Sequence, residues 1–343
     1  MSIGVTLLVL ALLIAGLLYA CEAFTNAIEW LGHKLGLNEG AVGSVLAAVG
    51  TALPETLVPL VALAASAWMG QAGGGEVALG AIVGAPFMLS TLAMGVSGVA
   101  VLVAARQGLR TLEVTADGVV MERDLRFFLI CFTPAIAAGF IPSRPLHLAL
   151  GVALLGAYAY YVKKTLDDPG ELSGMPEALH FGRNHDNPPL ALVVTQVVMS
   201  LLGIALAAHV FVGRVEHLAT LLAASPLILS LVITPVATEL PEKFNSVLWI
   251  RARKDTLALG NVTGAMVFQS CIPVTVGLWL TPWHLSGSSM IAAAVAWLAG
   301  MFQYLQVRRT GRMTLQALLL GAVFYVAFIG YVVVKTMAPG MVP

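Results

Sequence analysis

The residues with the clearest capacity for chemistry are in residues 50–55 (GTALPE), inside a long apolar stretch. Glu55 has no charged neighbour within 15 positions on either side, and a lone carboxylate at bilayer depth is costly enough to indicate a functional site. Pro54 lacks an N–H and leaves the carbonyl of Gly50 without its helical partner. The carboxylate, that carbonyl and the Thr51 hydroxyl one turn earlier are hard oxygen ligands, which suit Ca²⁺ or a similar cation.

The motif occurs twice. Residues 49–55 (VGTALPE) align with 236–242 (VATELPE) at five of seven positions, and residues 79–85 (LGAIVGA) align with 259–265 (LGNVTGA) at four of seven. Two motifs in the same order, each within an interrupted hydrophobic segment, are typical of a transporter built from internal repeats, with its site near the midplane.

The second copy carries additional charge. Glu242 corresponds to Glu55. Pro241, directly before it, leaves the carbonyl of Ala237 without its helical partner, as Pro54 does for Gly50. Glu239 and Lys243 are four residues apart, a favourable spacing for a helical ion pair, and a buried lysine needs such a partner. Three carboxylates and one ammonium leave a formal charge of minus two, enough for one divalent cation. The structural alternative is a buried salt bridge between Lys243 and Glu55 that holds the helices together.

Composition places the chain in a membrane. Of its 343 residues, 59% are hydrophobic and 10% are charged, and the mean hydropathy is +0.90; soluble domains contain about 25% charged residues. The formal net charge of zero does not indicate a nucleic-acid-binding protein. Cys21, Cys131 and Cys271 lie in apolar runs and are expected to be buried, without a disulfide or metal-binding spacing.

Ten segments approach the roughly 20 apolar residues that a spanning helix needs. We predict an all-α integral membrane protein with spans at 3–31, 40–69, 77–104, 126–141, 146–163, 189–212, 219–250, 256–280, 288–306 and 314–336. The second and seventh are long enough for two half-helices joined at the Pro-Glu break. Pro86 and Pro273 are expected to interrupt the third and eighth.

Three polar features lie outside this pattern. Residues 111–121 alternate around Asp117 and Gly118 and predict a small hairpin outside the membrane. Glu29 is expected at an interfacial helix end, whereas Glu22 could line an ion path. The hydrophilic stretch 165–188 predicts a cytoplasmic linker between two five-helix halves, residues 1–164 and 189–343.

Lysine and arginine predict the orientation. Alternating the ten segments puts 14 basic residues on one side and three, Arg144, Arg214 and Lys335, on the other. The basic side should be cytoplasmic, so both termini are expected outside the plasma (inner) membrane. Because each half has five spans, the two halves are expected to be inverted repeats.

At these motifs the sequence resembles the sodium/calcium exchanger family of the cation/Ca²⁺ antiporter superfamily. That family has two α-repeats, each with a G-T-S-L-P-E signature followed by G-N-x-x-G-S-N-I-x-N. The resemblance implies that Glu55 and Glu242 are paired Ca²⁺-binding carboxylates and that Thr51 and Thr238 supply oxygen ligands. Asn261 matches the first asparagine of the later signature in the second repeat.

The sequence also departs from the family pattern. The signature serine is Ala52 in the first repeat and Glu239 in the second. The later serine and asparagine positions fall in residues 84–89 (GAPFML) and 264–269 (GAMVFQ), where Gln269 alone is polar. Fewer side-chain oxygens remain for extra Na⁺ ions, and clustered carboxylates favour proton uptake when a divalent ion leaves. Protons are therefore expected to contribute to coupling, with a weaker role for Na⁺.

These observations predict a secondary active antiporter that exchanges Ca²⁺ or a related cation against Na⁺ and/or H⁺ by alternating access. Its partners would be inorganic cations and the lipid bilayer, without any cofactor besides the transported ions. One alternative is a non-transporting membrane sensor or scaffold with a degenerate ion site. The other is an intramembrane enzyme that uses Glu55 and Glu242 as an acid/base pair, although no nucleophile accompanies them in the sequence motif.

Overall fold

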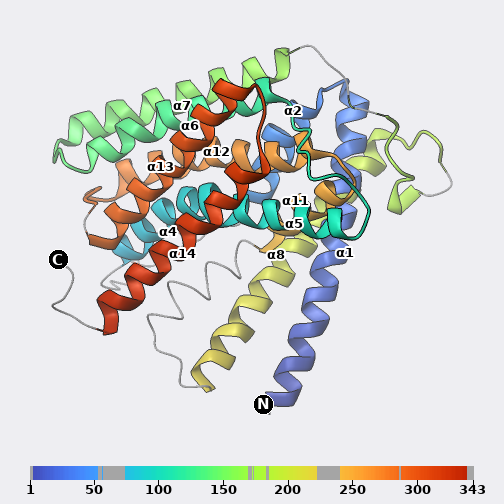
Figure 1. Cartoon of the computed structure of the whole chain (residues 1–343), viewed down its shortest axis with the longest axis horizontal. Helices are drawn as coiled ribbons and strands as arrows, with labels where there is room; N and C mark the ends of the chain where they lie inside the picture. The colour runs from blue at the N-terminus through green and yellow to red at the C-terminus, as the bar shows by residue number, and fades with distance from the viewer. Residues whose placement is uncertain are drawn as a thin grey trace.

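The computed structural model describes residues 3–52, 56, 74–168, 172, 174–182, 185–221, 240–285 and 287–337. Within these ranges the regular secondary structure is helical, without strands (Figure 1). Seven of the described helices are long and apolar enough to cross a membrane. The prediction of an all-α, multi-pass membrane protein is confirmed.

The first half has described helices that agree closely with the first, third and fifth predicted segments. Its elements are α1 (Ile3–Leu35), α2 (Glu39–Ala41) with the π-helix η1 (Val42–Ala47), α4 (Gly74–Met88) with the π-helix η2 (Leu89–Ala93) and α5 (Met94–Arg106), α6 (Gly118–Ala138) and α7 (Arg144–Asp167). Helical residues continue beyond η1 to position 52, and α4, η2 and α5 follow one another without a break.

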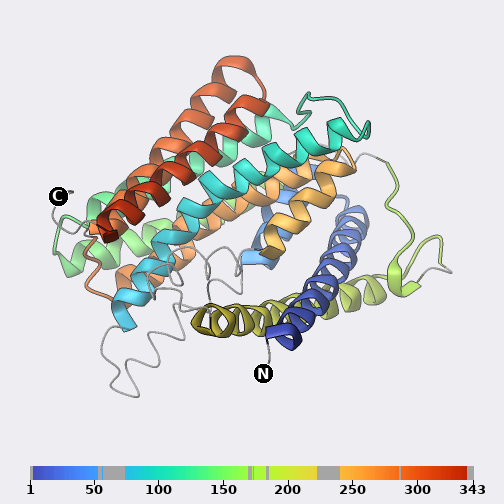
Figure 2. The same ribbon diagram turned by 60° about the horizontal axis from the view of Figure 1, so that its bottom comes forward.

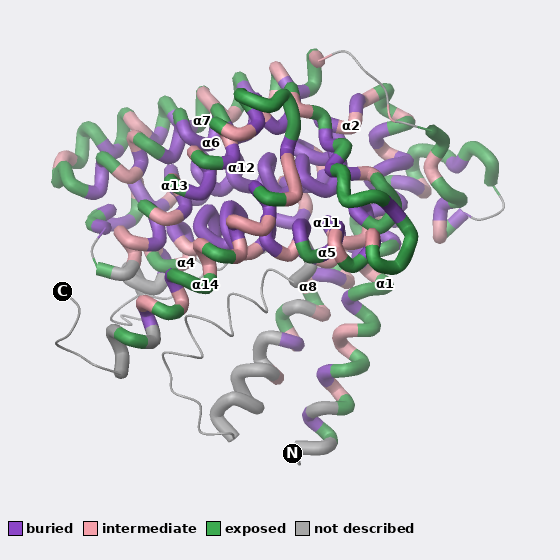
Figure 3. Tube along the Cα trace, in the orientation of Figure 1, coloured by how far each residue is buried: buried purple, intermediate pink, exposed green. Residues whose placement is uncertain are grey.

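Among its described residues, the second half contains five α-helices after the short 3₁₀ turn η3 (His180–Gly182). They are α8 (Leu190–Leu221), α11 (Leu240–Arg251), α12 (Asp255–Leu280), α13 (Gly287–Thr310) and α14 (Leu315–Met337). Figure 3 shows that α12 is buried along most of its length, so this helix lies at the centre of the described fold. All three cysteines are buried with free thiols, as predicted.

The fourth helix differs from its prediction. It begins at Gly118 rather than near residue 126, and the predicted hairpin around Asp117 is wrong. Asp117 is the N-cap, and its carboxylate accepts a hydrogen bond from the Val119 amide at 2.7 Å, which satisfies one of the free N–H groups at a helix start. The charged residues that follow are tolerated in the helix because Arg123 and Asp124 are buried together as an ion pair.

The prolines of the third and eighth spans do not end their helices. Pro86 lies within α4 and Pro273 lies within α12, and both helices continue. Neighbouring helices can satisfy the backbone groups that a proline releases in a membrane helix, and three residues after Pro86 the helix widens into η2. The predicted break at Pro54 lies outside the described residues. Pro241 is the second described residue of α11, and the residues directly before this helix, 222–239, are not described, so the break there also stays a prediction.

The contacts between the halves are reciprocal. In the first half, η1, α6 and α7 pack against α12; in the second half, α11, α13 and α14 pack against the continuous helix α4–η2–α5. The first helices of the two halves, α1 and α8, pack against each other (Figures 1 and 2). This exchange of equivalent contacts is the pattern that two repeats related by a two-fold axis produce.

The connections that follow α1, α5, α7, α11 and α13 meet on one side of the molecule, here called the basic face. Arg253 donates to the Leu109 carbonyl at 2.8 Å, and Arg312 pairs with Glu113 at 2.8 Å. Deeper in this face, Arg110 forms a two-pronged ion pair with Asp255 at 2.5 and 2.7 Å. The loop 107–117 is thereby fixed to the beginning of α12, and basic residues separated in sequence are gathered on one side.

Candidate cation-binding site

The two halves approach each other closely where η1 crosses α12. Glycines permit this approach: a Cβ on Gly43 would lie 2.9 Å from the Leu257 carbonyl oxygen, and one on Gly264 would lie 2.1 Å from the Ser44 carbonyl oxygen. Small residues at helix crossings allow close backbone contact in membrane proteins. The helix that carries η1 is started by Asn38, whose side chain accepts a hydrogen bond from the Ala41 amide at 2.8 Å.

This crossing brings together two predicted ligands from different halves. The Thr51 hydroxyl lies 3.2 Å from Oδ1 of Asn261 and 3.0 Å from the Ala47 carbonyl oxygen. Thr51 is 2% exposed and Asn261 is fully buried. Nδ2 of Asn261 has no hydrogen-bond partner among the described residues. A polar pair with remaining hydrogen-bonding capacity therefore lies between the repeats.

The other predicted residues are described to different extents. Gly50 precedes Thr51 in the same helix and faces Phe24 of α1. Gln269 is buried on α12, eight residues after Asn261, or about 12 Å along the axis from the helical rise. Glu242 lies in the first turn of α11, although its side chain is not described. Lys243 is 5% exposed and is not without an interaction partner.

Several predicted ligands lie outside the described residues. They are Glu55, Thr238, Ala237 and Glu239. Their grouping with Thr51 and Asn261 therefore remains a prediction.

The sequence analysis missed a buried polar cluster centred on Asp124 of α6. Its Oδ2 accepts hydrogen bonds from Ser44 at 2.6 Å and Thr263 at 2.7 Å, and its Oδ1 accepts from Tyr161 at 3.0 Å and from Arg123 at 3.2 Å. Asp124 is fully buried. The available signal is the adjacent Arg-Asp pair directly before the apolar run that begins at residue 126.

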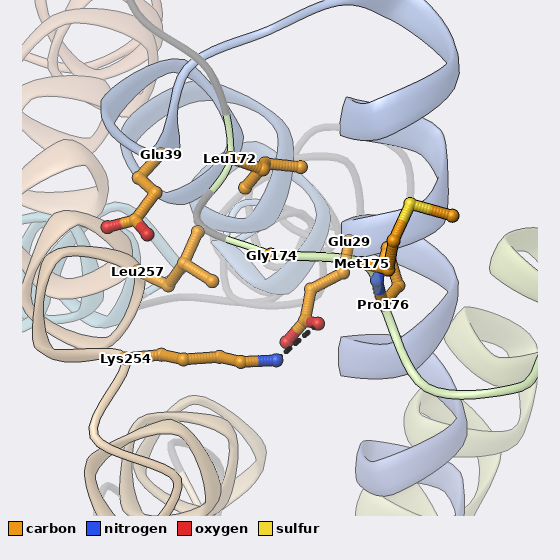
Figure 4. A pocket seen from close by; sticks show the side chains of 8 residues that line it. All are labelled: Glu29, Glu39, Leu172, Gly174, Met175, Pro176, Lys254 and Leu257. Atoms are coloured by element: carbon orange, nitrogen blue, oxygen red, sulfur yellow. Dashed lines mark hydrogen bonds and ion pairs between the residues drawn. The ribbon is translucent and has the colours of Figure 1, made fainter.

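Glu29 lies near the C-terminal end of α1 and has partners that the sequence analysis did not predict. It is 8% exposed, accepts a hydrogen bond from Trp249 Nε1 at 2.8 Å and pairs with Lys254 at 2.5 Å. It also lines a small pocket on the basic face, together with Glu39, Leu172 and residues 174–176 (Figure 4). The ion pair thus links α1 to the turn between α11 and α12. Glu22 is exposed on α1, which does not support a place in an enclosed ion path.

The sequence of this chain matches the family described as sodium/calcium exchanger protein over residues 5–163 and 192–337. The chain therefore belongs to the sodium/calcium exchanger family, and it is a cation antiporter rather than an enzyme.

Similar proteins agree with this assignment. The putative antiporter CaxA of Alkalimonas amylolytica is 23% identical over 325 residues, which cover 92% of this chain and 93% of the relative. The inner membrane protein YrbG of Escherichia coli strain K12 is 24% identical, with coverage of 80% and 81%. A solved structure of the sodium-calcium exchanger NCX_Mj superposes with a TM-score of 0.74 at 19% identity, covering 96% of this chain and 99% of that one. At this identity the structural match shows a shared fold.

Proposed function

We propose that this chain exchanges Ca²⁺ or a related cation against Na⁺ and/or H⁺ across the plasma (inner) membrane by alternating access. The observation that carries the proposal is the buried Thr51–Asn261 contact at 3.2 Å, which joins oxygen ligands of both repeats. Hard oxygen ligands of this kind suit such cations. The family model matches two segments on either side of residues 164–191, in keeping with two halves, 1–164 and 189–343, separated by a linker at 165–188.

The charge at the site would come from Glu55 and Glu242. A divalent cation that leaves water needs its charge balanced, and two carboxylates supply that balance without another ion. The remaining ligands in the proposal are Thr51, Thr238, Gly50, Ala237, Glu239, Asn261 and Gln269. Lys243 would balance the additional carboxylate of Glu239, because a buried ammonium needs an anionic partner.

The test is cation flux in proteoliposomes. Glu55→Gln and Glu242→Gln should each abolish uptake of labelled Ca²⁺ while the protein still folds into the membrane. Glu113→Gln is the control, because this carboxylate is exposed on the basic face and is absent from the proposed site. Near-normal uptake by either site variant would contradict the proposed ligands, and absence of flux in the parent protein would favour the sensor or scaffold alternative.

The coupling ion can be separated in the same vesicles. We expect a pH gradient to drive divalent-cation uptake, with a weaker contribution from Na⁺, because clustered carboxylates can take up protons when the cation leaves. Uptake should be measured in a Na⁺ gradient at fixed pH and in a pH gradient at fixed Na⁺. Strong uptake driven by Na⁺ that ignores the pH gradient would contradict this expectation.

The proposed orientation places the basic face in the cytoplasm and both termini outside, because basic residues are retained on the cytoplasmic side. Tags at Met1 and Pro343 should then be accessible from outside intact cells. Protection of both tags would reverse the orientation.

A further inference from the structure

Asn245 of α11 is buried in a way that packing alone does not explain. Its side chain is fully buried, and neither Oδ1 nor Nδ2 has a hydrogen-bond partner among the described residues. Leaving a buried amide unpaired is unfavourable. The next residue shows the usual solution, because the Ser246 hydroxyl donates to the Ala258 carbonyl at 3.2 Å.

The contacts of α11 locate the face on which Asn245 lies. Ser246 faces α12, and Trp249 faces α1 through its hydrogen bond to Glu29. At about 100° per residue, Asn245 is roughly 40° from Trp249 and roughly 60° from Glu242 around the helix. Asn245 therefore lies on the side of α11 that carries Trp249, away from Ser246, one turn from Glu242 and one turn from Trp249; α5 also packs against α11.

These positions form a line along α11. Trp249 donates to Glu29, and Glu29 lines the pocket on the basic face (Figure 4). The unpaired amide of Asn245 comes next, followed by Glu242 in the first turn of the helix. Polar groups thus lead from the basic face toward the proposed central carboxylate along the contact between α1 and α11.

The repeat provides a comparison for Asn245. It follows Glu242 by three residues, and the residue three after Glu55 is Val58. An apolar residue stands at the equivalent position of the first repeat. The asparagine is therefore a feature of the second repeat alone, in a chain that has lost most of the serine and asparagine positions of its later signatures.

We propose that Asn245 is a further ligand for the transported cation. Its Oδ1 binds the partly dehydrated ion as it moves between Glu242 and the basic face, along the contact of α1 with α11. An amide oxygen is a neutral, hard ligand of the kind that Ca²⁺ and similar cations use, and Oδ1 of Asn245, which accepts no hydrogen bond from the described residues, is available to that ion. This inference rests on the proposed antiport.

The decisive variants are Asn245→Val, which copies the residue of the first repeat, and Asn245→Asp, which keeps an oxygen ligand. Ser246→Ala is the matched control, because it removes a polar group from the adjacent face of the same helix. Each purified protein is reconstituted for Ca²⁺ uptake, giving KM and maximal rate, and its thermal unfolding is recorded with and without Ca²⁺.

We expect Asn245→Val to raise KM for Ca²⁺ about tenfold, as loss of one charge-assisted contact predicts, and to unfold at an equal or higher temperature without Ca²⁺. Its stabilisation by added Ca²⁺ should shrink. Asn245→Asp should recover divalent-cation affinity, and Ser246→Ala should leave KM unchanged.

The outcomes separate this inference from the proposed function. Unchanged KM in Asn245→Val, in a parent that transports Ca²⁺ and is silenced by Glu242→Gln, would overturn the role of Asn245 alone. A lower unfolding temperature with unchanged KM would assign it a structural role and also overturn the inference. If Asn245→Val does not fold, Asn245→Asp decides: it must retain Ca²⁺-dependent stabilisation. A parent without flux would remove both the proposed function and this inference.

Discussion

Two buried polar regions of this protein differ in how completely their hydrogen bonds are satisfied. Both oxygens of Asp124 are filled, by donors from η1, α6, α7 and α12. Asn245 has no partner among the described residues, and Asn261 uses its oxygen but leaves Nδ2 unpaired. A satisfied buried charge fixes the helices around it, whereas an unsatisfied amide retains the capacity to bind a ligand. The contrast separates residues that hold the helices around the site in place from residues that can bind the ion.

The Asp124 cluster lies beside the crossing that it supports. Ser44 belongs to η1, and Thr263 is two residues from Asn261 on α12. Bonds from these two hydroxyls to one carboxylate fix the separation of the helices that carry Thr51 and Asn261. The cluster is therefore expected to act on transport through geometry and stability, without contacting the ion.

The largest expected effect is that of Asp124→Ala. The change removes the anion next to the buried Arg123, which keeps Asp168 as its other partner, and it removes the acceptor that three hydroxyls share. Loss of one partner of a buried pair costs about 3–5 kcal/mol. Thermal unfolding in detergent, compared with Asp124→Asn, would measure the loss. A stable Asp124→Ala protein with parental transport would erase the contrast between the two regions.

An intermediate effect is expected for Gly264→Ala. Its Cβ would lie 2.1 Å from the Ser44 carbonyl oxygen, so η1 and α12 must separate, and overpacking of this kind costs about 1–3 kcal/mol. The repeat supplies the control, because Gly84 occupies the equivalent position and no atom of the described residues lies within 4 Å of its added Cβ. We expect lower stability and Ca²⁺ affinity in Gly264→Ala and little change in Gly84→Ala; equal behaviour of the pair would contradict the crossing geometry.

The smallest effect on stability is expected for Thr51→Val, with its main consequence in ion affinity. The change removes a hydroxyl that contacts Asn261 and the Ala47 carbonyl, and one such hydrogen bond contributes about 0.5–1.5 kcal/mol. Thr165→Val is the control, because its hydroxyl donates within its own helix to Tyr161 at 2.8 Å. We expect a raised KM for Ca²⁺ in Thr51→Val and an unchanged KM in Thr165→Val. The same KM in both variants would mean that Thr51 holds the helices in place and does not bind the ion.

The amino-acid sequence by itself determined the class of protein and the approximate bounds of most spans that lie in the described residues, because a run of about 20 apolar residues is a local property. It also determined the repeated motifs, in which a proline next to a carboxylate has direct consequences for the backbone. Its error at α6 has the same origin: charges at 123 and 124 indicate a loop unless partners from other helices neutralise them.

The tertiary structure decided which residues meet. Thr51 and Asn261 are 210 positions apart, and their contact depends on glycines that let η1 and α12 cross closely. The Asp124 cluster likewise requires hydroxyls from three other helices, and the isolation of Asn245 follows from the faces that α11 turns toward α1 and α12. Crossing angles and helix rotations depend on side-chain packing across the whole assembly, and no local pattern of residues encodes them.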